Sequence, residues 1–239
     1  MVQQETSRAL AGQLKTPDYL TRRALDASLF PKHDPSLRRA TPSTVSALTL
    51  QDVKQDYERV FRPDLTTIVV IGNVTLPQAR QSIEKYFGQW KASGAPPVTE
   101  LPPVPANQPG FTIVPDKSRV QVKVLLAETL GLNRFDPDYY ALELGNHVLG
   151  GGFYATRFYR DLRENAGLVY FVSSSFDVGK TRAIYAVDYA CDPQNVSRAR
   201  AVVVRDLKAI ASNACERRRL ATGKGDAVAA GASFGSKRG

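Results

Sequence analysis

The proline-rich stretch at residues 92–110 constrains the fold of this chain more than any other feature of its sequence. Six of its nineteen residues are proline. Proline fixes φ and lacks the N–H that helix interiors and central strands use, so the stretch is expected to be extended and semi-rigid, as interdomain linkers are. We therefore expect a first domain-like part over residues 1–91, a second over 111–212, and a separate basic tail at 213–239.

The first part is expected to be mostly helical, with one buried strand. Thr16, Thr41 and Thr49 each stand before residues with helical spacing, and threonine is a favourable N-cap because its hydroxyl accepts a hydrogen bond from a free backbone N–H. The β-branched run Thr66–Gly72 is short and bounded, which is typical of a buried strand. A further helix is predicted from Pro77 onward.

The second part has strand-like and helix-like segments in groups. The expected order is strand, strand, helix, helix, strand, strand, helix, at about 110–114, 118–128, 136–149, 155–165, 168–178, 182–191 and 192–212. Such grouping favours an α+β fold in which helices pack on a mostly antiparallel sheet. The first part looks like the end of a domain and the second like the start of one. The sequence therefore predicts two incomplete domains joined by the linker.

Composition excludes several classes of protein. A hydrophobic fraction of 43% and a charged fraction of 23% are typical of a soluble globular protein, and no apolar run is long enough to predict a transmembrane helix. The tail at 213–239 carries six basic and two acidic residues and so holds +4 of the net charge of +9. Basic residues elsewhere alternate with acids, so we expect no nucleic-acid partner.

Residues 1–15 lack the apolar core of a signal peptide, and bacterial periplasm and cytoplasm both stay open as locations of the protein. Cys191 and Cys215 have no metal-site spacing and are interpreted as ordinary thiols.

The usual catalytic and metal-binding patterns are weak or absent. The only histidines are His33, in a predicted loop, and His147, one helical turn after Glu143. Two such residues fall short of the three or four ligands that zinc takes, so an ordinary helix-surface pair is favoured. The run Gly145–Gly152 follows a helix rather than a strand and no Lys-Ser or Lys-Thr closes it, which argues against a phosphate loop. Nucleophilic hydrolysis has no Gly-x-Ser-x-Gly elbow to support it.

Arg163 and Tyr170 form the candidate site that stands out. Arg163 is expected at the end of a helix, and Tyr170 follows seven residues later, just after a turn. A guanidinium and a phenol are both hydrogen-bond donors, and together they suit a peptide carbonyl or a developing oxyanion. The alternative is that Arg163 caps the helix end while Tyr170 packs beneath it, and residue chemistry alone favours that alternative.

The segment around this pair resembles the second-half motif of the pitrilysin/insulinase family of inverzincin peptidases and of related processing peptidases. The resemblance rests on several segments in the family's order and spacing: Leu48–Val53, Phe61–Asp64, Val69–Val74, Leu144–Gly152, Thr156-Arg157 and Leu162–Tyr170. It covers about residues 16–212.

This resemblance implies a divided active site. In the family, one half holds zinc through an H-x-x-E-H motif and a distant Glu, and the other half contributes an Arg and a Tyr that hold the substrate. Arg163 and Tyr170 match those two positions. The glycine run before them, Gly150, Gly151 and Gly152, is interpreted from its residues as a hinge between two helices. No H-x-x-E-H motif exists in this chain, so no metal ligand is assigned here and zinc is expected only in a complementary half. The implied partners are a peptide substrate and a zinc-bearing half or subunit.

The tail at 213–239 departs from the family pattern, because it is rich in alanine, glycine and basic residues. We hypothesise a reading-frame shift near residues 213–220, since one choice of codons for Lys224–Ala229 reads one base later as an amphipathic helical string. The leading interpretation is therefore part of a zinc endopeptidase that is inactive alone. The alternatives are a structural, non-catalytic partner of a peptidase complex and a gene fragment without function.

Overall fold

A computed structural model describes residues 2–212, and the predicted basic tail lies outside these residues. The chain forms two compact units: residues 1–13 with 40–99, and residues 14–39 with the chain from 100 onward. Residues 14–39 thus belong with the part after the proline-rich stretch, although they precede it in sequence. The homology-domain boundaries predicted at 91 and 111 stay a prediction.

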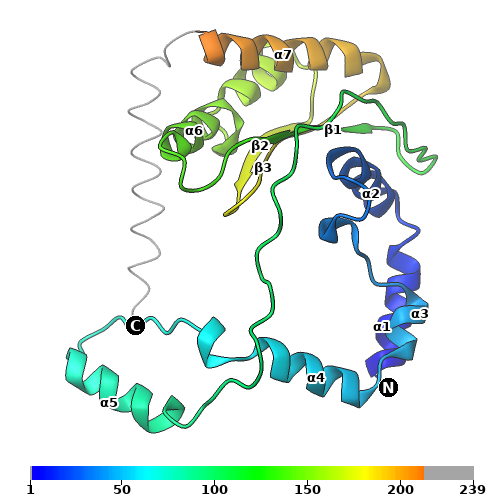
Figure 1. Cartoon of the computed structure of the whole chain (residues 1–239). Coiled ribbons are helices and arrows are strands. Elements are labelled where there is room, and N and C mark those ends of the chain that lie inside the picture. The colour runs from blue at the N-terminus through cyan, green and yellow to red at the C-terminus, as the bar shows by residue number, and fades with distance from the viewer. Residues whose placement is uncertain (1, 213–239) are drawn as a thin grey trace. The chain divides into compact units, whose positions relative to one another are not determined.

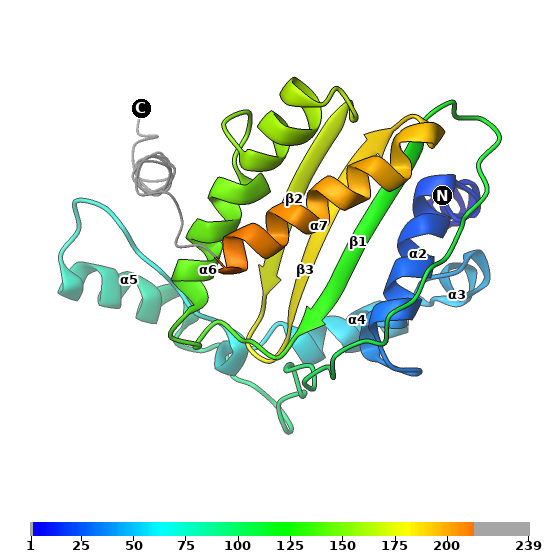
Figure 2. The same ribbon diagram turned by 90° about the horizontal axis from the view of Figure 1, so that it is seen from above.

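The second unit is built on a three-stranded antiparallel sheet. Its strands are β1 (Val122–Leu130), β2 (Phe171–Val178) and β3 (Ala183–Cys191), and β3 lies in the centre. Tyr189 of β3 pairs with Val124 on one side and Val172 on the other. Helix α7 (Val196–Ser212) crosses over the sheet, and α2 (Pro17–Leu29) runs beside β1 (Figure 2).

Shorter helical elements complete this unit. They are η1 (Pro35–Leu37), α6 (Tyr139–Asn146), the π-helical turns η3 (His147–Gly151) and η4 (Tyr159–Asn165), and η5 (Pro193–Asn195). The hydrophobic core lies where the sheet, η4 and α7 meet. It consists of Leu149, Phe158, Leu162, Leu168, Val169, Val172, Val187, Tyr189, Cys191, Ala199 and Val203. These helices on an antiparallel sheet confirm the predicted α+β fold.

The first unit is helical. It contains α1 (Val2–Gln13), α3 (Pro42–Ala47), α4 (Leu50–Val60), η2 (Pro63–Leu65) and α5 (Leu76–Phe87), as Figure 1 shows. Among residues 2–13 and 40–99 of this unit, only Arg62 is buried, and its guanidinium donates to both carboxylate oxygens of Asp64 and to the carbonyls of residues 93–95. No hydrophobic side chain among the described residues of this unit is buried.

The predicted N-caps are confirmed. The Thr16 hydroxyl accepts from the N–H of Tyr19, and Thr41 and Thr49 each form a reciprocal capping box. Proline follows directly at the first position of α2 and α3, where its missing N–H costs no hydrogen bond.

Two predicted strands are wrong. Residues 66–72 and 110–114 have no ladder partner in the described part of the chain, and neither forms a strand. Their β-branched and apolar residues suit a strand, but a strand also needs a neighbouring backbone to pair with. The strand predicted at 118–128 forms two to four residues later, as β1.

Two of the three helices predicted in the second part also differ in detail. The helix expected at 136–149 is α6 followed by η3, in which the Gly152 N–H reaches back five residues to the His147 carbonyl at 2.9 Å. The helix expected at 155–165 is largely the π-helical η4.

Candidate functional site

Arg163 lies in the last turn of η4, where the core fixes the backbone around it. Leu162, its predecessor, is fully buried. Gly167 then adopts a left-handed conformation with φ of 57°, and its N–H donates to the Arg163 carbonyl at 3.2 Å. The next N–H, of Leu168, donates to the Leu162 carbonyl at 2.8 Å. The turn predicted between Arg163 and Tyr170 is therefore present, and Gly167 makes it a tight connection between η4 and β2.

The Arg163 side chain is exposed. Its guanidinium carbon lies 5.1 Å from the centre of the Tyr159 ring, one turn earlier on η4. A cation over an aromatic face at this distance is weakly attracted, by about 0.5–1 kcal/mol at an exposed position. The ring therefore orients the guanidinium without covering its N–H donors.

Tyr170 lies between the turn and the first residue of β2. Its N–H donates to the Ala190 carbonyl at 2.9 Å, and the two residues before it, Leu168 and Val169, are buried. The side chain is half exposed, and its hydroxyl donates to Asp192 Oδ1 at 3.0 Å. This hydrogen bond, together with the negative charge of Asp192, raises the pKa of the Tyr170 phenol above its usual value.

The two predicted site residues thus lie at opposite ends of one short, well-anchored connection. No hydrogen bond joins Arg163 to Tyr170 within residues 2–212, so each keeps its own partner. Sequence reasoning missed Asp192, which was interpreted only as a helix start. Asp192 directly follows the second of two neighbouring predicted strands, and Tyr170 lies at the start of the first. In an antiparallel pair these two ends lie side by side, and this is the signal that could have identified Asp192.

A cluster of charges fastens η4 to α7. Asp206 of α7 is fully buried, and it lies 2.9 Å from the Arg205 guanidinium and 3.4 Å from Arg157 Nε. Arg205 also donates to Asp161 of η4 at 3.0 Å. Burial raises the pKa of Asp206, whereas at Asp161 burial is outweighed by Arg160, Arg205 and Arg157, which lower its pKa. The cluster therefore holds η4, whose last turn carries Arg163.

The three glycines predicted as a hinge lie in tight surroundings. A Cβ added to Gly150 would stand 2.5 Å from both a Phe158 ring carbon and Ser174 Oγ, and one added to Gly151 would stand 2.6 Å from Asn146 Nδ2. The close approach therefore favours glycine most strongly at Gly150, whereas at Gly151 the nearest atom is the end of the flexible Asn146 side chain and at Gly152 the nearest atom stands 3.0 Å away. Whether Gly150, Gly151 and Gly152 also act as a hinge stays a prediction.

Glu143 and His147 do not extend into a metal site. Burial raises the pKa of the Glu143 carboxyl. Within residues 2–212, no three His, Cys, Asp or Glu side chains gather in a way that could hold a metal ion.

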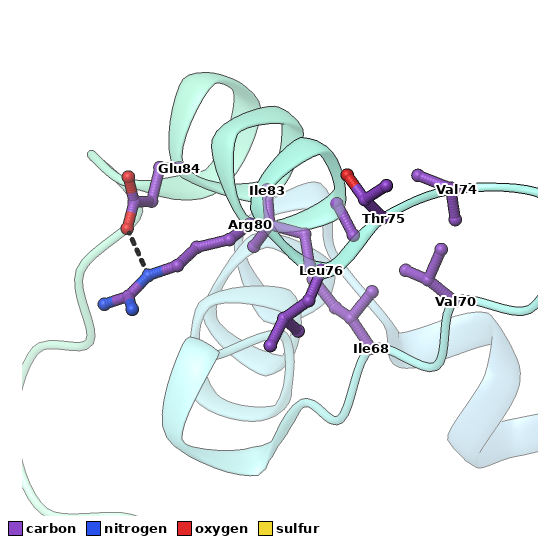
Figure 3. Close-up of a pocket in the computed structure, with 9 residues that line it drawn as sticks. Ile68, Val70, Val74, Thr75, Leu76, Arg80, Ile83 and Glu84 are labelled. Atoms are coloured by element: carbon purple, nitrogen blue, oxygen red, sulfur yellow. Dashed lines mark hydrogen bonds and ion pairs between the residues drawn. The ribbon is translucent and has the colours of Figure 1, made fainter.

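A cavity of about 660 Å³ lies in the first unit, between α5 and the unpaired segment that precedes it (Figure 3). Its walls include Ile68, Val70, Leu76 and Ile83, and it contains neither Arg163 nor Tyr170. Its lining is mostly apolar, and its two charged members, Arg80 and Glu84, pair with each other at 3.0 Å.

Comparison with known families decides what kind of chain this is. The family described as the Peptidase M16 inactive domain matches residues 47–221, well over half of the sequence. The chain belongs to the M16 peptidase family. The pitrilysin/insulinase resemblance is thereby confirmed, and the match is to the domain of M16 peptidases that is described as inactive.

Curated M16 relatives are longer than this chain. An uncharacterized zinc protease of Mycobacterium leprae is 27% identical over 177 residues, which are 72% of this chain and 39% of the relative. An uncharacterized zinc protease of Streptomyces coelicolor is 29% identical over 168 residues, 65% of this chain and 34% of the relative. The probable inactive metalloprotease YmfF of Bacillus subtilis is 21% identical over 166 residues, 70% of this chain and 38% of the relative. The chain thus spans less than two fifths of each of these proteins.

Solved structures share the fold. A peptidase M16 inactive domain from Pseudomonas fluorescens has a TM-score of 0.81 at 21% identity, over 95% of this chain and 54% of that one. The periplasmic protease PqqL from Escherichia coli has a TM-score of 0.74 at 17% identity, over 96% and 25%. A chain of complex III2 from Candida albicans has a TM-score of 0.71 at 17% identity, over 97% and 56%.

No helix in the described part of this M16 chain combines the length and the apolar character needed to cross a membrane.

Proposed function

We propose that this M16 chain supplies the substrate-holding half of a two-part zinc peptidase, with Arg163 and Tyr170 as the residues that contact a peptide. The observation that carries this proposal is that both side chains are exposed while the backbone between them is fixed by the core. Leu162, Leu168 and Val169 are buried, and the tight turn at Gly167 links them. Exposed polar groups on a rigid scaffold are typical of a binding site, because little order is lost when a ligand arrives.

The chemistry of the two groups suits a peptide backbone. The Arg163 guanidinium offers only donors, which fit a carbonyl oxygen. The Tyr170 phenol is both a donor and an acceptor. The chemistry that a bound zinc supplies, polarising the carbonyl and activating water, would belong to the complementary half.

Peptide binding by the full chain tests this proposal. We expect a fluorescein-labelled decapeptide from casein to bind, and Arg163→Ala and Tyr170→Phe each to weaken it by about three- to tenfold, since one hydrogen bond contributes about 0.5–1.5 kcal/mol. Matched controls are Arg198→Ala and Tyr140→Phe, which change exposed residues of the same types in the same unit.

Equal loss of affinity in the control variants would remove the case for a site at Arg163 and Tyr170. The isolated chain is also expected to hold no stoichiometric zinc and to cleave no peptide. Tightly bound zinc accompanied by peptidase activity in the isolated chain would overturn the proposal.

A structural role in a larger assembly is the second candidate. It is favoured by the exposed apolar residues of α4, among them Leu50, Val53 and Tyr57, since a large exposed apolar face is typical of an interaction surface. It also fits the likeness in fold to a chain of complex III2. Peptide affinity that Arg163→Ala and Tyr170→Phe leave unchanged would favour this role over the first.

A further inference from the structure

Asp192 is an N-cap residue whose carboxylate does not cap. It precedes η5, and its backbone carbonyl accepts from the Asn195 N–H at 2.9 Å, but its side chain makes no capping hydrogen bond. Asp34 in the same unit shows the usual arrangement, with Oδ1 accepting from the Ser36 N–H at 2.8 Å. Asp192 instead accepts the Tyr170 hydroxyl proton at 3.0 Å. Its carboxylate therefore serves Tyr170 rather than its own helix.

This hydrogen bond decides what Tyr170 can offer to a ligand. A phenol has one proton, and here that proton points to a carboxylate, which makes the bond charge-assisted and stronger than a neutral one. The Gln121 side chain also hydrogen-bonds to this phenol, in the sense that lowers its pKa. With its proton committed to Asp192, the phenol oxygen presents only its remaining lone-pair capacity to an incoming molecule. Tyr170 in this state accepts a hydrogen bond, although residue chemistry alone had suggested a donor.

We infer that Asp192 is a positioning residue, which holds the Tyr170 phenol as an acceptor for a backbone N–H of a bound peptide. The inference rests on the proposed function and deepens it. Arg163 offers only donors and is matched to a peptide carbonyl, whereas Tyr170 held by Asp192 is matched to a peptide N–H. The two residues together then recognise both polar groups of a peptide backbone and need no particular side chain.

The backbone around Asp192 supports this role. Asp192 directly follows Cys191, which is fully buried at the end of β3, and Tyr170 is anchored through its N–H to Ala190 of the same strand. Both partners therefore start from one rigid strand end. Neither side chain has to be ordered by the ligand, which keeps the entropic cost of binding low.

The test uses the full chain and a fluorescein-labelled casein decapeptide, with a set of analogues that each carry one methylated backbone nitrogen. Asp192→Ala should weaken binding by about three- to tenfold, and Asp192→Asn, which keeps an oxygen acceptor, should stay within about twofold of the unsubstituted protein. Asp192→Ala combined with Tyr170→Phe should bind as Tyr170→Phe alone, since Asp192 acts through Tyr170.

The methylated analogues identify the atom that Tyr170 contacts. At one peptide position, methylation should weaken binding to the unsubstituted protein by about three- to tenfold more than binding to Tyr170→Phe. Equal penalties in both proteins at every position would overturn the inference, as would unchanged affinity in Asp192→Ala. If Arg163→Ala and Tyr170→Phe themselves leave affinity unchanged, the proposed function fails. If only the Asp192 results fail, the site stands and Tyr170 acts without this partner.

Discussion

Replacing Gly150 by alanine should destabilise the second unit substantially. The new methyl carbon would stand 2.5 Å from Ser174 Oγ and 2.5 Å from a ring carbon of Phe158. Phe158 is fully buried and Ser174 nearly so, which leaves neither side chain free space to move into. Forcing one methyl group into a filled core costs about 1–3 kcal/mol.

A second cost comes from a hydrogen bond. Ser174 Oγ donates to Asn146 Oδ1 at 2.6 Å, and shifting the serine away from the methyl group disturbs that bond. A buried hydrogen bond contributes about 1 kcal/mol, so Gly150→Ala should lower the free energy of unfolding by about 2–4 kcal/mol. Ser174→Ala in the Gly150→Ala background removes the hydroxyl that the methyl meets, and it should recover part of this loss.

Urea denaturation followed by circular dichroism measures the effect. Gly145→Ala is the matched control, because Gly145 lies in α6 and nothing stands within 4 Å of its added Cβ. In a helix, alanine is favoured over glycine by about 0.8–1.0 kcal/mol, so this control should become more stable. A loss below about 0.5 kcal/mol in Gly150→Ala, or no recovery from the added Ser174→Ala, would refute the steric reasoning. If Gly150 served only as a flexible hinge, Gly150→Ala would instead leave the free energy of unfolding nearly unchanged.

Three further predictions concern other parts of the chain. Gly167→Ala should cost about 1 kcal/mol in denaturant melts, because alanine is strained at a φ of 57°. Burial raises the pKa of Tyr189 to about 12, so the folded state keeps a proton that the unfolded state loses near pH 10. The free energy of unfolding should therefore fall as pH rises from about 10 to about 12, and the ultraviolet absorbance of the tyrosine phenolates should still be increasing near pH 12. Arg62→Lys should speed proteolysis within residues 93–95 severalfold, because a lysine cannot make the forked hydrogen bonds of Arg62 to Asp64 and the three carbonyls.

Local signals in the sequence predicted local structure well. Thr16, Thr41 and Thr49 were identified as N-caps because capping involves a side chain and a backbone N–H only a few residues away, and each makes that bond. The neighbouring strands at 168–178 and 182–191 were also predicted, and they form the antiparallel pair β2 and β3 on either side of a short turn at Gly179. Helix α1 was not predicted, because its composition is polar, and its Gln3 amide bonds to three carbonyls of residues 45–48, which lie far away in sequence.

In the candidate site, too, the local features were predicted and the long-range contact was missed. Arg163 and Tyr170 were found from residue type and spacing, and the helix end and turn between them could be predicted from Gly167. The hydrogen bond from Tyr170 to Asp192 was missed, because it joins residues 22 positions apart that meet only once β2 and β3 are paired in register. That pairing matters for the site, because it gives the phenol proton of Tyr170 a partner within the chain.

The wrong strand at 66–72 shows where sequence information ends. The exposed fractions of residues 68 to 71 alternate, at 41%, 74%, 49% and 83%, so the segment has the two-residue period of a strand, with Ile68 and Val70 turned toward α5. Strand β3 alternates in a similar way, but it has a paired neighbour on each side, one of them about 60 residues earlier in the chain. Residue preference therefore made both segments extended, and only the pairing made one of them a strand. A sequence pattern can predict an extended conformation from the residues themselves, whereas strand pairing depends on which other segment of backbone lies alongside.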